Sequence, residues 1–119
     1  MLKKEIVANM EKIVENCMGE ETAACVATCP MHTDVKEYVR LIKEEKGEEA
    51  IKVIREKLFI PGTLGRVCAH PCENQCKWNE GKSPMAIASL KRYAADNFDK
   101  EENWDLSVKN SNGKKVAVI

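Results

Sequence analysis

The chain has 119 residues, enough for one domain that buries roughly two thirds of its unfolded surface. Its 19 Lys and Arg residues balance its 19 Asp and Glu residues, so it lacks the basic surplus typical of a nucleic-acid-binding protein. No apolar run approaches the ~20 residues of a membrane span, and the first residues turn charged too soon for a signal peptide. We therefore expect a cytoplasmic protein with neither nucleic acid nor membrane as a partner.

The first third of the sequence predicts one long helix and one short one. Apolar residues at helical spacing indicate a helix over residues 2–16, with charged residues on its other face and Cys17 at its end. Residues 23–29 follow as a helical segment of a turn or two. Cys25 and Cys29 are four residues apart in it and are expected to point to one side. The proline that follows ends the segment.

A pair of antiparallel helices is predicted next, and we interpret it as scaffold. Thr33 or Asp34 caps the first helix, with Glu37 completing a capping box from Asp34, and Gly47 is expected to end it. Residues 48–58 form the second. The buried faces of the two helices are predicted to comprise Val35, Tyr38, Val39, Ile42, Ala50, Ile51, Ile54 and Leu58.

The next segment leads through a cysteine-rich stretch to one more helix. Residues 59–62 are predicted to form a turn that enters the stretch 64–76. Ser83 followed by Pro84 is a typical helix start, and this helix should run to about Asn97. Its inner face is predicted to comprise Ile87, Leu90, Tyr93 and Ala94.

The last residues change character. Residues 99–113 are polar and turn-prone and are interpreted as a linker. Residues 114–119 are two lysines followed by four apolar, mostly β-branched residues, a pattern typical of a buried parallel strand, with a frayed tail or edge strand as the alternative. One strand cannot form a sheet. The sequence therefore predicts an all-α domain over residues 1–98 and the first strand of a truncated second domain at 114–119.

The six cysteines are the chemical feature of the chain. They are Cys17, Cys25, Cys29, Cys68, Cys72 and Cys76. In a reducing compartment, regularly spaced cysteines favour metal binding over disulfides. The segment Cys25-x3-Cys29-Pro30 has the ending C-x3-C-P. This ending is typical of ferredoxin-type runs, in which the last cysteine serves a second cluster. The sequence therefore predicts an iron–sulfur site.

Other interpretations of the cysteines stay open at this point. Structural zinc sites prefer C-x2-C pairs, which are absent from this sequence. A zinc-stabilised helical interaction module is nevertheless the main alternative. Structural disulfides and a thiol catalyst are further alternatives, although no Cys–His–acid arrangement is discernible. The candidate zinc ligands are Cys25, Cys29, Cys68 and Cys72, with His32 or His70 in reserve.

Three longer motifs carry a family resemblance. They are Cys17-x7-Cys25-x3-Cys29-Pro30, then Gly65-Arg66-Val67-Cys68-x2-Pro71-Cys72-Glu73-x2-Cys76, and Pro84-x2-Ile87-x2-Leu90-Lys91-Arg92-Tyr93. Together they resemble the N-terminal iron–sulfur domain of the small (beta) subunit of NADPH-dependent glutamate synthase, which is similar to the N-terminal domain of dihydropyrimidine dehydrogenase. The resemblance covers roughly residues 17–97. It extends to residues 113–119, which look like the first strand of that family's FAD-binding domain.

The resemblance implies a small helical domain of the alpha-helical ferredoxin type that holds 4Fe–4S clusters through all six cysteines. By position, three of them would face one cluster, namely Cys17, Cys25 and Cys76. The other three would face a second cluster, namely Cys29, Cys68 and Cys72. The fourth ligands depart from the pattern, because Glu20 stands where the family has a cysteine and Lys91 where dihydropyrimidine dehydrogenase is expected to use a glutamine. Glu20 is a possible oxygen ligand, whereas an ammonium group cannot bind iron, so one or two clusters are expected.

The resemblance also implies the role of the domain within a larger NADPH-dependent oxidoreductase. NADPH would reduce FAD in a C-terminal region that follows residue 119, and electrons would pass singly through the clusters. The acceptor would be a flavin in a partner, such as the glutamate synthase large subunit or a similar flavoprotein. This chain would then be an electron relay without catalytic residues of its own.

Overall fold

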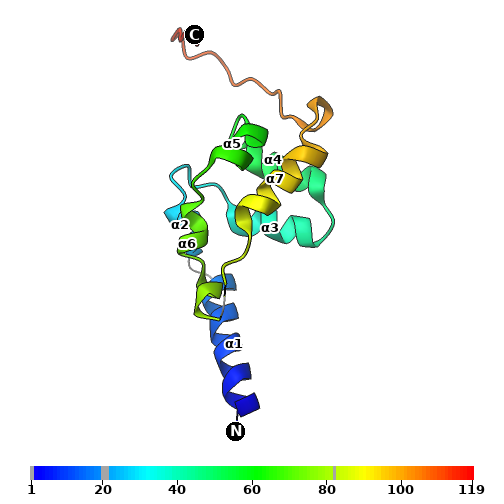
Figure 1. Cartoon of the computed structure of the whole chain (residues 1–119). Coiled ribbons are helices and arrows are strands. Elements are labelled where there is room, and N and C mark those ends of the chain that lie inside the picture. Colours follow the sequence, from blue (N-terminus) through cyan, green and yellow to red (C-terminus); the bar gives the residue numbers. More distant parts are fainter. Residues whose placement is uncertain (1, 20–21, 82) are drawn as a thin grey trace.

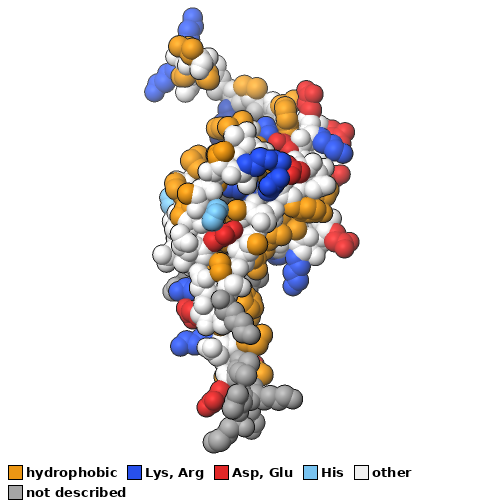
Figure 2. All heavy atoms as spheres, viewed as in Figure 1, with side chains coloured by type: hydrophobic (Ala, Val, Ile, Leu, Met, Phe, Trp, Pro, Cys, Tyr) orange, Lys and Arg blue, Asp and Glu red, His pale blue; other side chains and the backbone are white. Residues whose placement is uncertain are grey.

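The computed structural model describes residues 2–19, 22–81 and 83–119 of the chain, and regular structure in this part is entirely helical, as predicted (Figure 1). The helices are α1 (Leu2–Met18), α2 (Ala24–Thr28), α3 (Val35–Lys43), α4 (Gly47–Arg55), α5 (Pro61–Val67), α6 (Pro71–Asn74), the 3₁₀ helix η1 (Lys77–Glu80), α7 (Ile87–Phe98) and the 3₁₀ helix η2 (Glu101–Asn103). Among the described helices, none combines the length and apolarity that crossing a membrane requires. Cationic and anionic side chains are interspersed on the face shown in Figure 2, in keeping with the balanced charge.

Asp34 caps the start of α3 as predicted, but the carboxylate of Glu37 accepts hydrogen bonds from Arg40 instead of completing the box. The backbone N–H of Glu37 donates to Asp34 Oδ1 at 3.1 Å, which confirms Asp34 as the cap. The end of the helix does not follow the prediction either. Gly47 does not end α3; it is the first residue of α4. The turn between the helices is made instead by Glu45, whose φ of 61° is left-handed, and the N–H of Lys46 closes it on the carbonyl of Leu41 at 2.9 Å.

The core lies where the α3–α4 hairpin packs against α7 (Figure 1). Leu41 is buried in it, while the predicted core residues Val39 and Ile42 are only partly buried at its edge. Cys72 of α6 belongs to this core although it was predicted only as a ligand. The buried residues of the core are Val35, Tyr38, Leu41, Ala50, Ile51, Ile54, Leu58, Cys72, Ile87, Ala94 and Ala95.

Gly47 serves packing rather than termination, and this predicts a loss of stability on substitution. A Cβ at position 47 would overlap the ring of Phe98 at the end of α7. We expect Gly47→Ala to lower the free energy of unfolding by about 1–3 kcal/mol, because the ring must leave its place. Gly62→Ala is the matched control, since nothing lies within 4 Å of a Cβ there. Denaturant unfolding of both variants measures the difference; equal midpoints would contradict the packing role.

The predicted helix start at Ser83 and Pro84 is wrong, because α7 begins at Ile87. No side-chain cap precedes it; the carboxylate of Glu73 in α6 accepts the N–H of Ala88 at 2.9 Å and takes the place of a local cap. The inner face is also rotated relative to the prediction. Tyr93 is 49% exposed and Leu90 only partly buried, and the residues buried on α7 are Ile87, Lys91, Ala94 and Ala95.

Part of the segment predicted as a turn before the cysteine-rich stretch is helical. Pro61 occupies the first turn of α5, a position that suits its fixed φ and missing N–H. The helix packs closely on α7, and Gly65 permits this because a Cβ there would lie 3.1 Å from Arg92 Cα. Arg66 joins the same two helices through an ion pair with Asp96 at 2.8 Å.

The two ends of the chain extend in opposite directions from the packed helices (Figure 1). Helix α1 projects away from them, and its buried Ile13 side chain, 2% exposed, lies at its junction with η1. Residues 99–103 stay attached, because Arg55 pairs with Asp99 at 2.9 Å. Residues 114–119 are exposed and have no regular structure. The division into a domain over 1–98, a linker over 99–113 and a first strand of a second domain stays a prediction.

Candidate metal centre

Cys17, Cys25 and Cys76, here called the first thiol group, line one cavity of about 310 Å³. Cys17 lies near the end of α1, Cys25 in α2, and Cys76 directly before η1. The rest of the wall is largely apolar, with cationic side chains at part of its rim. The apolar residues are Val14, Ala23, Val35, Val39, Trp78, Met85 and Ile87. Three segments far apart in the sequence therefore place their thiols around one space.

Cys29, Cys68 and Cys72, here called the second thiol group, line a separate cavity together with Tyr38 and Lys91. This cavity is much smaller, about 30 Å³, so a cluster there requires its walls to move apart, whereas the first cavity is already open. The two trios expected by position are thus each brought together. That they bind iron stays a prediction.

The two cavities are neighbours and share an apolar wall. Val35 and Ile87 line both of them, and each side chain is only 3% exposed. No polar side chain lines both cavities within the described residues. The two cavities are therefore separated by buried apolar side chains, which exclude water.

Local backbone geometry explains how closely spaced cysteines reach different cavities. Cys25 lies within α2, but Cys29 already lies outside it with φ −63° and ψ 122°, so the two line different cavities instead of pointing to one side. Cys72 lies within α6 and Cys76 beyond its end, which separates that pair in the same way. His70, with a left-handed φ of 43°, turns the chain from Cys68 into α6.

Hydrogen bonds to the sulfur atoms add polar contacts that the sequence did not reveal. The N–H of His70 donates to Cys68 Sγ at 3.3 Å, and the N–H of Met85 donates to Cys76 Sγ at 3.4 Å. Thr33, 2% exposed, lies 3.7 Å through its hydroxyl from Cys29 Sγ. Sequence analysis noticed Thr33 only as a candidate helix cap, since backbone donors leave no signature in the side chains. Such donors stabilise thiolates and tune a bound metal.

The thiols differ in acidity because their surroundings differ. Burial raises the pKa of Cys25 to about 11. Burial first, and then the charges of Cys29 and Cys68, raise the pKa of Cys72. Burial also acts on Cys29, but hydrogen bonds from Thr33 and the backbone outweigh it and lower its pKa below 9.0. Cys29 is therefore more acidic than Cys25 and Cys72, and metal binding by those two thiols must release protons.

This difference predicts the order in which the metal-free thiols are alkylated. The thiolate is the nucleophile, so a lowered pKa brings reactivity at lower pH and a raised pKa delays it. As the pH rises, we expect the alkylation rate of Cys29 to reach half its maximum below pH 9.0 and that of Cys25 only near pH 11. Peptide mass spectrometry after brief iodoacetamide treatment measures the modification of both cysteines in one sample. Thr33→Val should move the Cys29 profile to higher pH; an unchanged profile would contradict the role of Thr33.

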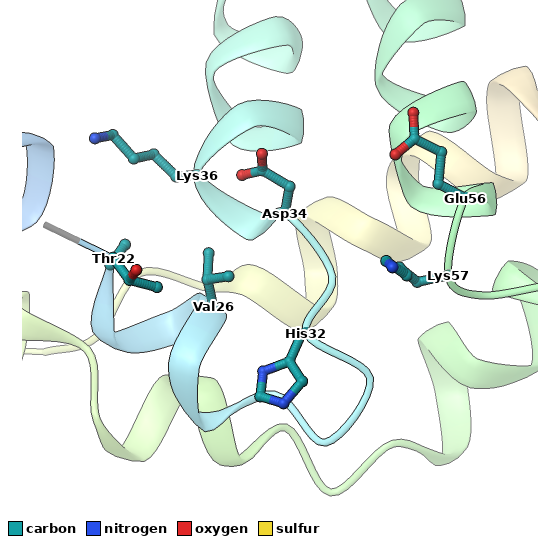
Figure 3. Close-up of a pocket in the computed structure, with 8 residues that line it drawn as sticks. Thr22, Val26, His32, Asp34, Lys36, Glu56 and Lys57 are labelled. Atoms are coloured by element: carbon teal, nitrogen blue, oxygen red, sulfur yellow. The ribbon is translucent and has the colours of Figure 1, made fainter. Parts of the chain in front are cut away.

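The remaining candidates lie apart from the thiols or outside the described residues. Glu20, the possible oxygen ligand, lies outside them. His32 lines a different surface pocket with Val26 and Asp34, as Figure 3 shows, and no cysteine lines that pocket. His70 Nδ1 lies 3.2 Å from Glu73 Oε2 and its side chain is 47% exposed.

The alternative, a single zinc site, is not assembled in the described residues. Among the residues that the structure describes, no three His, Cys, Asp or Glu side chains converge closely enough to hold a single metal ion. The four candidate ligands are divided, because Cys25 lines the first cavity and the other three line the second. Thiolates that lie too far apart to bind one metal ion can still bind a cluster, because each thiolate then binds a different iron atom. The donor set of two thiol trios with apolar walls and N–H donors therefore fits iron–sulfur clusters better than zinc.

Comparison with known proteins leads to the same chemistry. The chain is 44% identical over 75 residues to the beta subunit of an NADP(+)-dependent formate dehydrogenase from Moorella thermoacetica, covering 63% of the chain and 11% of that protein. It is 33% identical over 114 residues to the beta subunit of an NADPH-Fe(3+) oxidoreductase from Geobacter sulfurreducens, covering 94% of the chain and 16% of that protein. The glutamate synthase [NADPH] small chain of Escherichia coli is 29% identical over 108 residues, covering 88% of the chain and 23% of that protein.

The chain thus spans less than a quarter of the length of each of these relatives. A family model described as dihydropyrimidine dehydrogenase domain II, 4Fe-4S cluster, matches residues 3–103. This range includes every helix from α2 to η2, nearly all of α1, and both thiol groups. The protein therefore belongs to the family of dihydropyrimidine dehydrogenase domain II, a 4Fe–4S cluster domain.

Proposed function

We propose that the chain is the electron-relay domain of an NADPH-dependent oxidoreductase and that it holds one 4Fe–4S cluster at each thiol group. The observation that carries the proposal is the division of six cysteines into two trios around neighbouring cavities. A 4Fe–4S cluster supplies one-electron chemistry when bound. The two thiol groups would each provide three thiolates to it.

The residues around the thiols have separate tasks in this proposal. The apolar walls exclude water, and the N–H groups of His70 and Met85 hold the sulfur atoms of Cys68 and Cys76 by hydrogen bonds. The shared wall of Val35 and Ile87 keeps the two groups close, which favours electron passage between them. No general acid, base or nucleophile is needed for this task.

The donor and acceptor lie outside the chain in this proposal. The names of the three relatives share NADP(+) or NADPH, whereas formate, ferric iron and glutamate differ. This supports a common NADPH side, with FAD in a region beyond residue 119 as the immediate donor. The electron acceptor would then differ from protein to protein. For this chain we propose a flavin in a partner, such as the glutamate synthase large subunit. The uncrosslinked cysteines suit a reducing cytoplasm.

Anaerobic reconstitution with iron and sulfide tests the proposal. Two clusters correspond to about eight iron and about eight sulfide per chain, with visible absorption that bleaches on reduction and an electron paramagnetic resonance signal from the reduced state. Failure to take up iron and sulfide, together with stoichiometric zinc binding, would establish the zinc module instead. About four iron per chain would retain the relay but restrict it to one cluster.

A further inference from the structure

The second cavity is lined by one buried charged residue that cannot itself be an iron ligand. Lys91 lies on the inner face of α7 and is only 7% exposed. It lines the second cavity with Cys29 and Cys72. Lysine is almost never buried to this extent without a partner. In the described part of the chain, Lys91 has no ion pair with a carboxylate.

The acidic side chain that acts on the second thiol group is already engaged. Glu73 acts on Cys72 from α6, but its carboxylate accepts the N–H of Ala88 at 2.9 Å and lies 3.2 Å from His70 Nδ1. The charge of Lys91 instead acts on the sulfur atoms, lowering the pKa of both Cys29 and Cys72 against the opposing effect of burial. Lys91 thus lines the same cavity as the thiols on which its charge acts.

The first cavity has cations of another kind. Lys36, Arg40 and Lys43 lie at its rim. Lys36 Nζ donates to the carbonyl of Gly19 at 3.0 Å, and Arg40 pairs with Glu37 and Glu44 on the surface. Solvent screens exposed charges, whereas a buried charge acts through a lower dielectric and is felt more strongly. The half-buried Lys36 also acts on a thiol of the first group, lowering the pKa of Cys17 against the larger effect of burial. Among the described lining residues, only the second cavity has a buried cation, Lys91.

We propose that Lys91 sets the reduction potential of the cluster at the second thiol group and leaves that of the first largely unchanged. The inference rests on the proposed function. A cluster gains one negative charge on reduction, so a nearby fixed cation stabilises the reduced form and raises the potential. Lys91 would act on the cluster through its positive charge and would not ligate iron.

Redox titration of the reconstituted chain, followed by electron paramagnetic resonance, tests this proposal. Lys91→Met keeps the length of the side chain and removes its charge, and Lys91→Leu is a second neutral variant. We expect the potential of the second cluster to shift to more negative values in both. The first cluster should keep its potential, and Lys91→Arg should restore that of the second. Lys100→Met removes an exposed lysine after α7 and should change neither potential.

The assignment of each titration step uses Cys17→Ser, which retains only the second thiol group intact. Unchanged potentials in both neutral variants, or equal shifts of both clusters, would overturn the role of Lys91. Loss of the second cluster from both neutral variants would also overturn it, in favour of a role in assembly. These failures are distinct from failure of the proposed function, in which the unsubstituted chain takes up no cluster.

Discussion

Cys76→Ser is expected to remove one cluster and to leave the other in place. Cys76 lines only the first cavity, where it faces Cys17 and Cys25 across apolar walls. A serine hydroxyl is a much poorer ligand for iron than a thiolate, so the first thiol group would keep two thiolates. We expect iron to fall from about eight to about four per chain, with the redox step of the second cluster unchanged.

Cys68→Ser is the matched variant for the second thiol group. Cys68 is partly exposed and lies outside the hydrophobic core, unlike Cys72, so the substitution tests ligation with little effect on packing. The variant should retain the first cluster and lose the second. The redox step that remains should therefore differ from the one that remains in Cys76→Ser. If either substitution removed both clusters equally, the division into two trios would be contradicted.

Removing iron from the reconstituted chain is expected to release α1 while the core stays folded. The helix is 17 residues long and helices of about this length are marginal in water by themselves. Its described attachments are few: Ile13 at the junction with η1, Cys17 in the first cavity, and the carbonyl of Gly19 bonded by Lys36. The buried residues of α4, by contrast, pack against α3 and α7 without involving iron.

Hydrogen exchange before and after chelation measures this release. Amides of α1 should lose at least about tenfold protection, or about 1.4 kcal/mol, whereas amides of α4 should keep theirs. Cys17→Ser, reconstituted with iron, should show the same loss in α1 with the second cluster still present. Equal loss of protection in α1 and α4 on chelation would show that iron supports the whole fold.

Local signals in the sequence predicted most of the helices, because each depends on neighbours in the chain. The Asp34 cap of α3 is an example, since its carboxylate and the N–H of Glu37 lie within one helical turn. The long helix before Cys17 follows equally from apolar spacing. The same holds for the cysteines, whose spacing predicted which of them would share a cavity once a family resemblance supplied the register.

The errors arise where a residue acts through a distant contact. Gly47 looked like a helix terminator, but its missing Cβ makes room for Phe98, 51 positions further along the chain. Ser83 looked like a cap, but Glu73 takes that task from another helix. Lys91 was missing from the predicted inner face of the last helix, and the packing of α7 buries it. None of these long-range contacts leaves a pattern that can be recognised in a single sequence.

We expect the membership of Cys72 in the hydrophobic core to give the two proposed clusters different lifetimes. Cys72 is 8% exposed among Ile and Leu residues, so the core should hold this thiolate in place for as long as it stays folded. Heat or denaturant should therefore expel the second cofactor only when the whole protein melts. At the first thiol group one proposed ligand, Cys17, lies on the projecting helix α1, so we expect the first cluster to be lost while the rest of the molecule stays native.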